Sequence, residues 1–332
     1  MPFFCINTLI KIYPLILMSV HTLDIDSGER DPIAYPNPGD YVVELKNPIY
    51  NVSKISLVSA RIHASQLLIN DRNNTFSVNG TTISLPNENY SGNELASELL
   101  SKFQAAAAGS VPISTATYDK SKNDLTFGGT APFTFEFYGG NNGFNTGSEG
   151  LTTPHDILGL PASNVTSVNN TLTTGSINLQ GPDALILKIS SGAEELNKTV
   201  YSDTPFYTGR ILMCGDVINY SGADDAVEHN FDTGAQNISK LRIQFFYSSN
   251  NRLIPYDFRN ANHVLKLSIH GIIDKLKTIP NVKKDFSLPP PMRVPELEDP
   301  NRWNALLYIS MIIATGIVFM LFTRPKIPKI SG

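Results

Sequence analysis

The sequence has 332 residues, of which 17% are charged, and a formal net charge of -4. This length allows one large β domain or two small ones with a buried core. Because no basic excess is present, nucleic acid is not expected as a partner. Two cysteines, Cys5 and Cys214, are too few for a disulfide framework or a zinc site built from cysteines.

Residues 1–23 are interpreted as an apolar N-terminal arm or as a leader upstream of the true start. Residues 3–17 are mostly apolar but are interrupted by Asn7 and Lys11. The segment lacks the basic beginning and the small-residue cleavage site of a secretory signal. A polar run follows from Met18. A buried arm, translation from Met18 and a weak signal sequence therefore stay open.

Residues 24–274 contain short runs that alternate between apolar and polar side chains. This period of two is typical of antiparallel strands with one buried face. Between Leu57 and Val58 the apolar phase shifts, which predicts a β-bulge, and Asn79-Gly80 predicts a hairpin turn. The clearest runs are residues 41–45, 133–137, 185–189, 241–247 and 265–269.

One helix is expected among these strands. Ser91 and Glu94 have the spacing of a capping box, and Leu95, Leu99 and Phe103 then share one face. We expect this helix to lie over the sandwich and to cover an edge or an open end. The predicted fold is mainly β: a jelly-roll-like antiparallel β-sandwich with one short helix insertion, plus a single C-terminal transmembrane helix. Without an internal repeat, one elaborated jelly roll is favoured over two in tandem.

Residues 275–302 are predicted to form a stalk that is first basic and then rich in proline. Its lysines favour either attraction to an anionic lipid surface or an ordinary exposed basic segment. Its prolines favour polyproline II, a semi-rigid spacer. The lysines are Lys275, Lys277, Lys283 and Lys284, and the prolines are Pro289, Pro290, Pro291 and Pro295.

Residues 303–323 are predicted to form the transmembrane helix, followed by a short basic tail at 324–332. Residues 303–322 (WNALLYISMIIATGIVFMLF) contain no charge, and at about 1.5 Å per residue they span roughly 30 Å, the thickness of a bilayer core. The alternative is a buried core helix. The expected anchor residues are Trp303, Tyr308, Phe319, Phe322, Arg324, Lys326 and Lys329.

The side of the membrane on which the body lies is indicated by two opposing signals. The basic tail favours a cytosolic C-terminus by the positive-inside rule. The missing signal peptide favours a body that stays on the cytosolic side, and we give this second signal more weight.

Motifs that would indicate catalysis are missing from the sequence. It contains no G-x-S-x-G elbow, no paired zinc histidines and no phosphate loop. An acidic cluster could hold a divalent cation, but a solvated loop is the simpler interpretation. We therefore expect no enzyme, no cofactor and no metal site. The cluster consists of Asp216, Asp224, Asp225 and Glu228, next to His229.

Seven segments of the body share their pattern and their order with a known class of proteins. They are residues 31–45 (DPIAYPNPGDYVVEL), 48–62 (PIYNVSKISLVSARI), 90–100 (YSGNELASELL), 116–119 (ATYD), 123–127 (NDLTF), 155–160 (HDILGL) and 254–263 (IPYDFRNANH). These segments resemble minor capsid and penton-type structural proteins of nucleocytoplasmic large DNA viruses. The resemblance covers most of residues 24–270 and implies a jelly-roll-like capsid component. The stalk and anchor depart from the penton type and suit a minor protein that ties a shell to a membrane.

The expected function is that of a structural virion protein, a minor capsid protein linking the icosahedral capsid shell to the internal viral membrane. Its expected partners are the major capsid protein, other minor capsid proteins and the lipid bilayer, and a homo-oligomer is possible. The expected location is the interface between capsid and internal membrane, with a single-pass membrane form in the host during assembly. The alternatives are a membrane-tethered jelly-roll binding module for glycan or receptor recognition and, as a third hypothesis, a tethered hydrolase.

Overall fold

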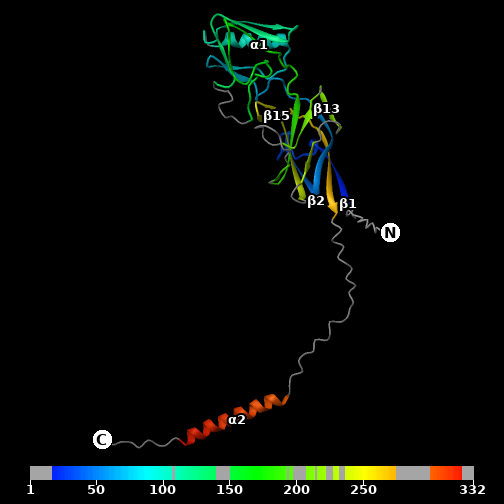
Figure 1. Cartoon of the computed structure of the whole chain (residues 1–332), viewed down its shortest axis with the longest axis vertical. Helices are drawn as coiled ribbons and strands as arrows, with labels where there is room; N and C mark the ends of the chain where they lie inside the picture. Colours follow the sequence, from blue (N-terminus) through cyan, green and yellow to red (C-terminus); the bar gives the residue numbers. More distant parts are fainter. Residues whose placement is uncertain are drawn as a thin grey trace, which may run out of the picture. The chain divides into compact units, whose positions relative to one another are not determined.

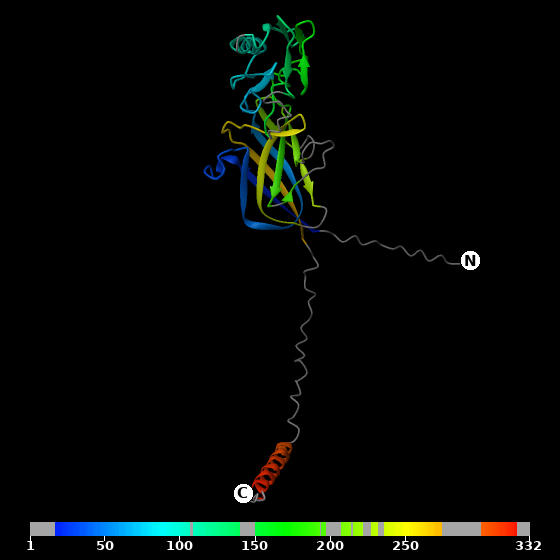
Figure 2. The same cartoon turned by 90° about the vertical axis from the view of Figure 1, so that its left-hand side faces the viewer.

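The computed structural model describes residues 17–106, 109–139, 150–192, 194–196, 207–213, 215–221, 227–231, 236–273 and 300–323. The chain divides into two compact units, Met1–Asp274 and Lys275–Gly332. We refer to the first unit as the body. Within it, the buried side chains form two separate hydrophobic clusters. Figures 1 and 2 show the body with α1 at one end and with β1 and β2 at the other.

The sandwich lobe is built from one large antiparallel sheet in the order β1-β17-β2-β15-β10-β11. Its long strands are β1 (Leu17–Asp26), β2 (Asp40–His63), β10 (Ala184–Ser191), β15 (Gln236–Ser249) and β17 (Val264–Ile273). Its short elements are η1 (Ser27–Glu29), β11 (Glu194–Glu195), β12 (Gly209–Leu212), β13 (Val217–Tyr220), β14 (Glu228–Asn230) and β16 (Arg252–Pro255).

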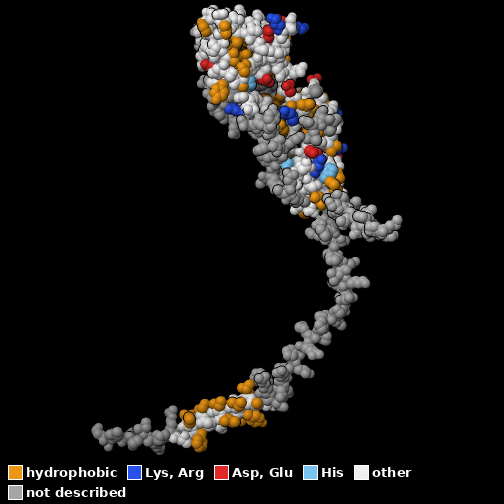
Figure 3. Space-filling model, viewed as in Figure 1, with side chains coloured by type: hydrophobic (Ala, Val, Ile, Leu, Met, Phe, Trp, Pro, Cys, Tyr) orange, Lys and Arg blue, Asp and Glu red, His pale blue; other side chains and the backbone are white. Residues whose placement is uncertain are grey.

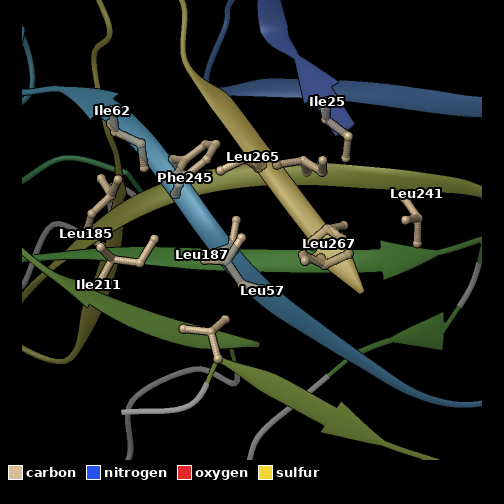
Figure 4. Packing of buried hydrophobic residues seen from close by; sticks show 14 of the residues in the cluster. Ile25, Leu57, Ile62, Leu185, Leu187, Ile211, Leu241, Phe245, Leu265 and Leu267 are labelled. Carbon is tan, nitrogen blue, oxygen red and sulfur yellow. The ribbon is translucent and has the colours of Figure 1, made fainter. Parts of the chain in front are cut away.

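The 24-residue strand β2 curls this sheet around a core. Its first part pairs with β15, whereas its second part pairs with β17 on one side and with β13 and β14 on the other. Side chains from β2, β10, β15 and β17 consequently meet inside the curl, as Leu57, Leu187, Phe245 and Leu267 do in Figure 4. The register between β2 and β17 skips Val58, so the predicted bulge is confirmed.

The helix lobe contains two small sheets and one helix. The first sheet has the order β4-β3-β7-β8 and the second has the order β5-β6-β9. The first comprises β3 (Thr75–Val78), β4 (Thr81–Ser84), β7 (Thr134–Glu136) and β8 (Asn164–Thr166). The second comprises β5 (Ile113–Asp119), β6 (Asp124–Gly129) and β9 (Thr171–Thr173), and the helix is α1 (Gly92–Ala105).

Phenylalanine rings fill the core of the helix lobe. Phe135 lies at its centre, with ring centroids 5.2 Å from Phe127, 5.7 Å from Phe76 and 6.0 Å from Phe103. The predicted capping box is confirmed, because the Glu94 amide bonds the Ser91 hydroxyl and the Glu94 carboxylate accepts from the Ser91 amide. That pair of hydrogen bonds lowers the pKa of Glu94.

The mainly β, jelly-roll-like class, the single helix insertion and the apolar C-terminal helix are confirmed, and two details differ from expectation. The helix does not cover an edge of the large sandwich: Leu95, Leu99 and Phe103 are buried in the helix lobe's own core. Residues 17–23, expected in the arm, belong to β1 and pair with β17 along its length. Both differences arise from contacts between segments distant in sequence. Residues 1–16 of the arm lie outside the described residues.

Candidate membrane anchor

The helix α2 (Pro300–Phe322) carries the strongest candidate for a functional segment. Within the described residues it is the one helix long and apolar enough to cross a membrane, over Asn304–Phe322, and none of that span is buried. A core helix of a soluble protein would bury most of its side chains. The surface of α2 is dominated by hydrophobic side chains in Figure 3, and Phe319 and Phe322 are 72% and 86% exposed.

The serine and threonine hydroxyls within the apolar span of α2 are bonded inside the helix. The Ser310 hydroxyl donates to the Leu307 carbonyl at 2.8 Å, and the Thr315 hydroxyl donates to the Met311 carbonyl at 2.6 Å. In hydrocarbon an unpaired polar group costs several kcal/mol, because no water replaces the missing partner. The helix therefore meets the main requirement of a lipid-exposed span from its own atoms.

The predicted anchor residues are described only in part. Tyr308, Phe319 and Phe322 lie on α2 with exposed side chains. Trp303 lies within the bounds of α2, but its side chain is outside the description. The tail residues Arg324, Lys326 and Lys329, the stalk prolines Pro289, Pro290, Pro291 and Pro295, and the stalk lysines also lie outside the described residues, so their roles stay predictions.

A buried histidine holds together two of the segments that carry the sequence resemblance. The Tyr41 hydroxyl and His263 Nε2 are 3.0 Å apart, and the His263 ring packs against Phe245 and Phe258 with centroid distances of 4.6 and 4.8 Å. Burial lowers the pKa of His263 to about 4, with a smaller contribution from nearby Arg30. The imidazole is therefore neutral at physiological pH and acts as a core side chain.

Arg30 links the loop before β2 to the residues that surround His263. Its guanidinium donates to the carbonyl oxygens of Ser27, Tyr35 and Pro36, and to Asn262 Oδ1 at 3.1 Å. The loop and the end of the 254–263 segment thereby become neighbours although more than 200 residues separate them. The sequence shows no paired histidines, and no local signal links His263 to Tyr41.

Within the described residues, the other histidines and the acidic side chains do not gather at one site. His155 is buried beside Thr153, and burial lowers its pKa. Glu228 forms an ion pair with Lys54 at 2.5 Å, whereas Asp224 and Asp225 of the acidic cluster are outside the description. Among the residues that the structure covers, no group of three His, Cys, Asp or Glu side chains could hold a metal ion.

Two polar cavities lie where the two lobes of the body meet. The smaller, of about 210 Å³, is lined by Asp156 and Leu68 of the helix lobe and by Arg210 and Tyr247 of the sandwich lobe. The larger, of about 500 Å³, is lined in part by Leu68 and Asp216. Typical small-molecule sites are mostly apolar and enclose about 300–1,000 Å³. These cavities are predominantly polar openings that lack a convergent set of catalytic groups.

Comparison with protein families matches residues 19–257 to a family of unknown function, DUF5901. The chain belongs to this family. The match spans both lobes of the body and stops before β17 and α2. No curated protein matches the DUF5901 chain.

Among solved structures, this DUF5901 chain is similar to two viral proteins. One is the mavirus penton protein, with 11% identity and a TM-score of 0.39, covering 77% of this chain and 100% of that chain. The other is a chain in a cryo-electron-microscopy structure of the Sputnik virophage, with 10% identity and a TM-score of 0.35, covering 76% of this chain and 98% of that chain.

Proposed function

We propose that this DUF5901 chain is a minor capsid protein that links an icosahedral capsid shell to an internal viral membrane. The observation that carries the membrane part is α2, a fully exposed apolar helix of hydrocarbon length whose Ser310 and Thr315 hydroxyls are bonded internally. In the proposal, α2 enters the bilayer, residues 275–302 act as the stalk and the body contacts the shell.

The capsid part of the proposal is supported by where the resembling segments lie in the fold. Residues 31–45 and 254–263 meet at the Tyr41–His263 contact, and residues 90–100 form the cap and first turns of α1. Residues 116–119 and 123–127 form the hairpin of β5 and β6. The motifs thus build the scaffold of the body, as expected for a protein whose role is to present surfaces.

The partners in this proposal are the major capsid protein, other minor capsid proteins and the bilayer, with self-association as a further possibility. A stable contact between the body and a shell protein buries roughly 1,000 Å² or more in total. No residue is assigned a catalytic role. The proposed location is the interface of capsid and internal membrane in the virion, with a single-pass membrane form in the host during assembly.

Purified particles provide the test. Cross-linking followed by mass spectrometry should join lysines of the body, such as Lys188 or Lys240, to a major shell protein. Alkaline carbonate treatment of the membrane fraction, after the shell is removed, should leave the chain with the lipid. If the chain is missing from particles, or carries no link to a shell protein, the capsid role is wrong.

A membrane-tethered glycan-binding module is the second candidate, favoured by the polar cavities between the lobes. Asp156, Asp183 and Arg210 at the smaller cavity are side chains that hydrogen-bond sugar hydroxyls well. Binding of the full chain in detergent to immobilised glycans, lost on Asp183→Ala, would support this function instead. The absence of glycan binding together with cross-links to the shell would favour the capsid role.

A further inference from the structure

The outer face of the β1–β17 pair is apolar at only one of its ends. In the register of the pair, Met18 lies opposite Ile272 and Val20 lies opposite His270. Alternation points these side chains outward, because Ile25 on β1 and the odd-numbered leucines of β17 are buried in the core. Met18, Val20 and Ile272 are 54%, 59% and 38% exposed.

The other end of the same face is polar. Thr22 lies opposite Ser268, and Asp24 forms an ion pair with Lys266 at 3.4 Å. Val264 is the single exposed apolar residue of β17 at this far end. The apolar character is therefore confined to the end at which β1 begins and β17 finishes.

The backbone of Tyr50 on β2 lies beside this end of the pair. Its carbonyl oxygen lies 3.3 Å from the position that a Cβ on Gly271 would occupy, so it is beside the last residues of β17. Tyr50 is 62% exposed. Tyrosine is enriched at membrane–water interfaces, because its ring contacts acyl chains while its hydroxyl stays hydrated. We call Met18, Val20 and Ile272 the tether-end patch; hydrophobic side chains are visible at this end of the body in Figure 3.

The segment that joins the body to α2 limits how far the patch can lie from the membrane that α2 enters. The last residue of β17 is Ile273, and α2 begins at Pro300, so 26 residues (274–299) join them. Even fully extended, 26 residues reach at most about 90 Å, which bounds the distance between the body and the surface that α2 enters. A tether of this length gives an effective concentration in the millimolar range, at which a weak surface contact is occupied.

The residues that adjoin the patch in sequence favour the same partner. Leu17 pairs with Ile273, so the apolar residues 3–16 join the body at the same end as the tether. The nearest charged residue before the patch is Lys11, and Asp274, Lys275 and Lys277 follow it, so these four residues carry a net charge of +2. Basic residues beside an apolar surface are attracted to anionic headgroups by about 1 kcal/mol each.

We propose that the tether-end patch rests on the lipid surface into which α2 is anchored, so that this end of the body faces the bilayer. The inference depends on the proposed anchoring by α2 and adds a second, interfacial contact made by the body. It also implies that the helix lobe, at the opposite end of the body, is the part available to the shell.

The test uses the full chain with Cys5 and Cys214 replaced by serine and one fluorescent label at a time. Labels are placed through Val20→Cys in the patch, Val264→Cys at the far end of the same face and Ile313→Cys in α2. Val264 is a matched control because it is also a valine, is 45% exposed and lies on the same outer face. The chain is reconstituted into phosphatidylcholine–phosphatidylserine vesicles that contain spin-labelled lipid, which quenches nearby fluorophores.

We expect strong quenching at positions 313 and 20 and little at position 264, and weaker quenching at position 20 when phosphatidylserine is omitted. A second pair, Ile272→Cys against Lys266→Cys, repeats the comparison on β17. Quenching at 313 with none at 20 and 272 would overturn this inference while leaving the anchor in place. Equal quenching at 20 and 264 would overturn it as well. No quenching at 313 would refute the anchor and the inference together.

Discussion

A single carboxylate at the centre of α2 should release the chain from membranes. The apolar span Asn304–Phe322 has its midpoint at Ile313, whose side chain is 57% exposed. An aspartate at a helix centre costs about 2.5–3.5 kcal/mol for insertion, and loss of the isoleucine removes roughly another 0.5 kcal/mol. Ile313→Asp should therefore lower the membrane partition constant by about 10²–10³-fold.

The measurement is alkaline carbonate extraction after synthesis of the full chain in the presence of microsomes. The wild type should remain in the membrane pellet, and Ile313→Asp should move largely to the supernatant. Asn304→Asp is the matched control, because the same charge at the end of the span reaches the headgroup region at little cost. Equal retention of wild type and Ile313→Asp, or equal release of the two aspartate variants, would refute the transmembrane assignment.

Three further predictions concern the body. Phe135→Ala should destabilise the helix lobe by about 3–5 kcal/mol in urea unfolding, since it leaves a cavity among packed phenylalanine rings; an unchanged midpoint would contradict that packing. The pKa of His263 falls from 6.5 to about 4 on burial. The contribution of the neutral imidazole to the unfolding free energy is therefore complete above about pH 6.5 and is lost as the pH falls towards 4. That loss amounts to about 3 kcal/mol at most, and His263→Gln should flatten the dependence of the unfolding free energy on pH between those values; equal slopes for both proteins would argue against it. Gly159 has φ +64, and a Cβ there would lie 2.6 Å from the Ser176 carbonyl oxygen, so Gly159→Ala should cost about 1–3 kcal/mol by thermal unfolding. A melting temperature equal to that of the wild type would contradict this tight turn.

Local features of the fold were predictable from short stretches of sequence. The capping box at Ser91 and Glu94, the bulge at Val58 and the Asn79-Gly80 turn all appear where the residues indicated. Asn79 and Gly80 have φ values of 48° and 78°, which asparagine and glycine adopt more readily than other residues. Each signal depends on atoms within a few residues, so the surrounding fold changes it little.

The division of the body into two cores was not predictable in this way. Leu95, Leu99 and Phe103 form an apolar stripe, and such a stripe shows that the helix packs against something without showing what. The same holds for Tyr41 and His263: Tyr41 lies on the part of β2 that pairs with β15, whereas His263 precedes β17, which pairs with the other part of β2. The tether-end patch likewise depends on the register of Leu17 with Ile273, which is set by the fold as a whole.

The sequence alone determined the apolar faces of the strands, the position and N-terminal cap of α1, and the charge-free length of α2. Hydrophobic period and turn chemistry determine these features because they act over a few residues. Only the tertiary structure decided that residues 68–179 enclose their own core, that His263 is neutral against Tyr41, and that Met18 and Ile272 share one exposed end. Those outcomes depend on which distant segments pair, and an alternating pattern specifies a buried face without specifying its partner.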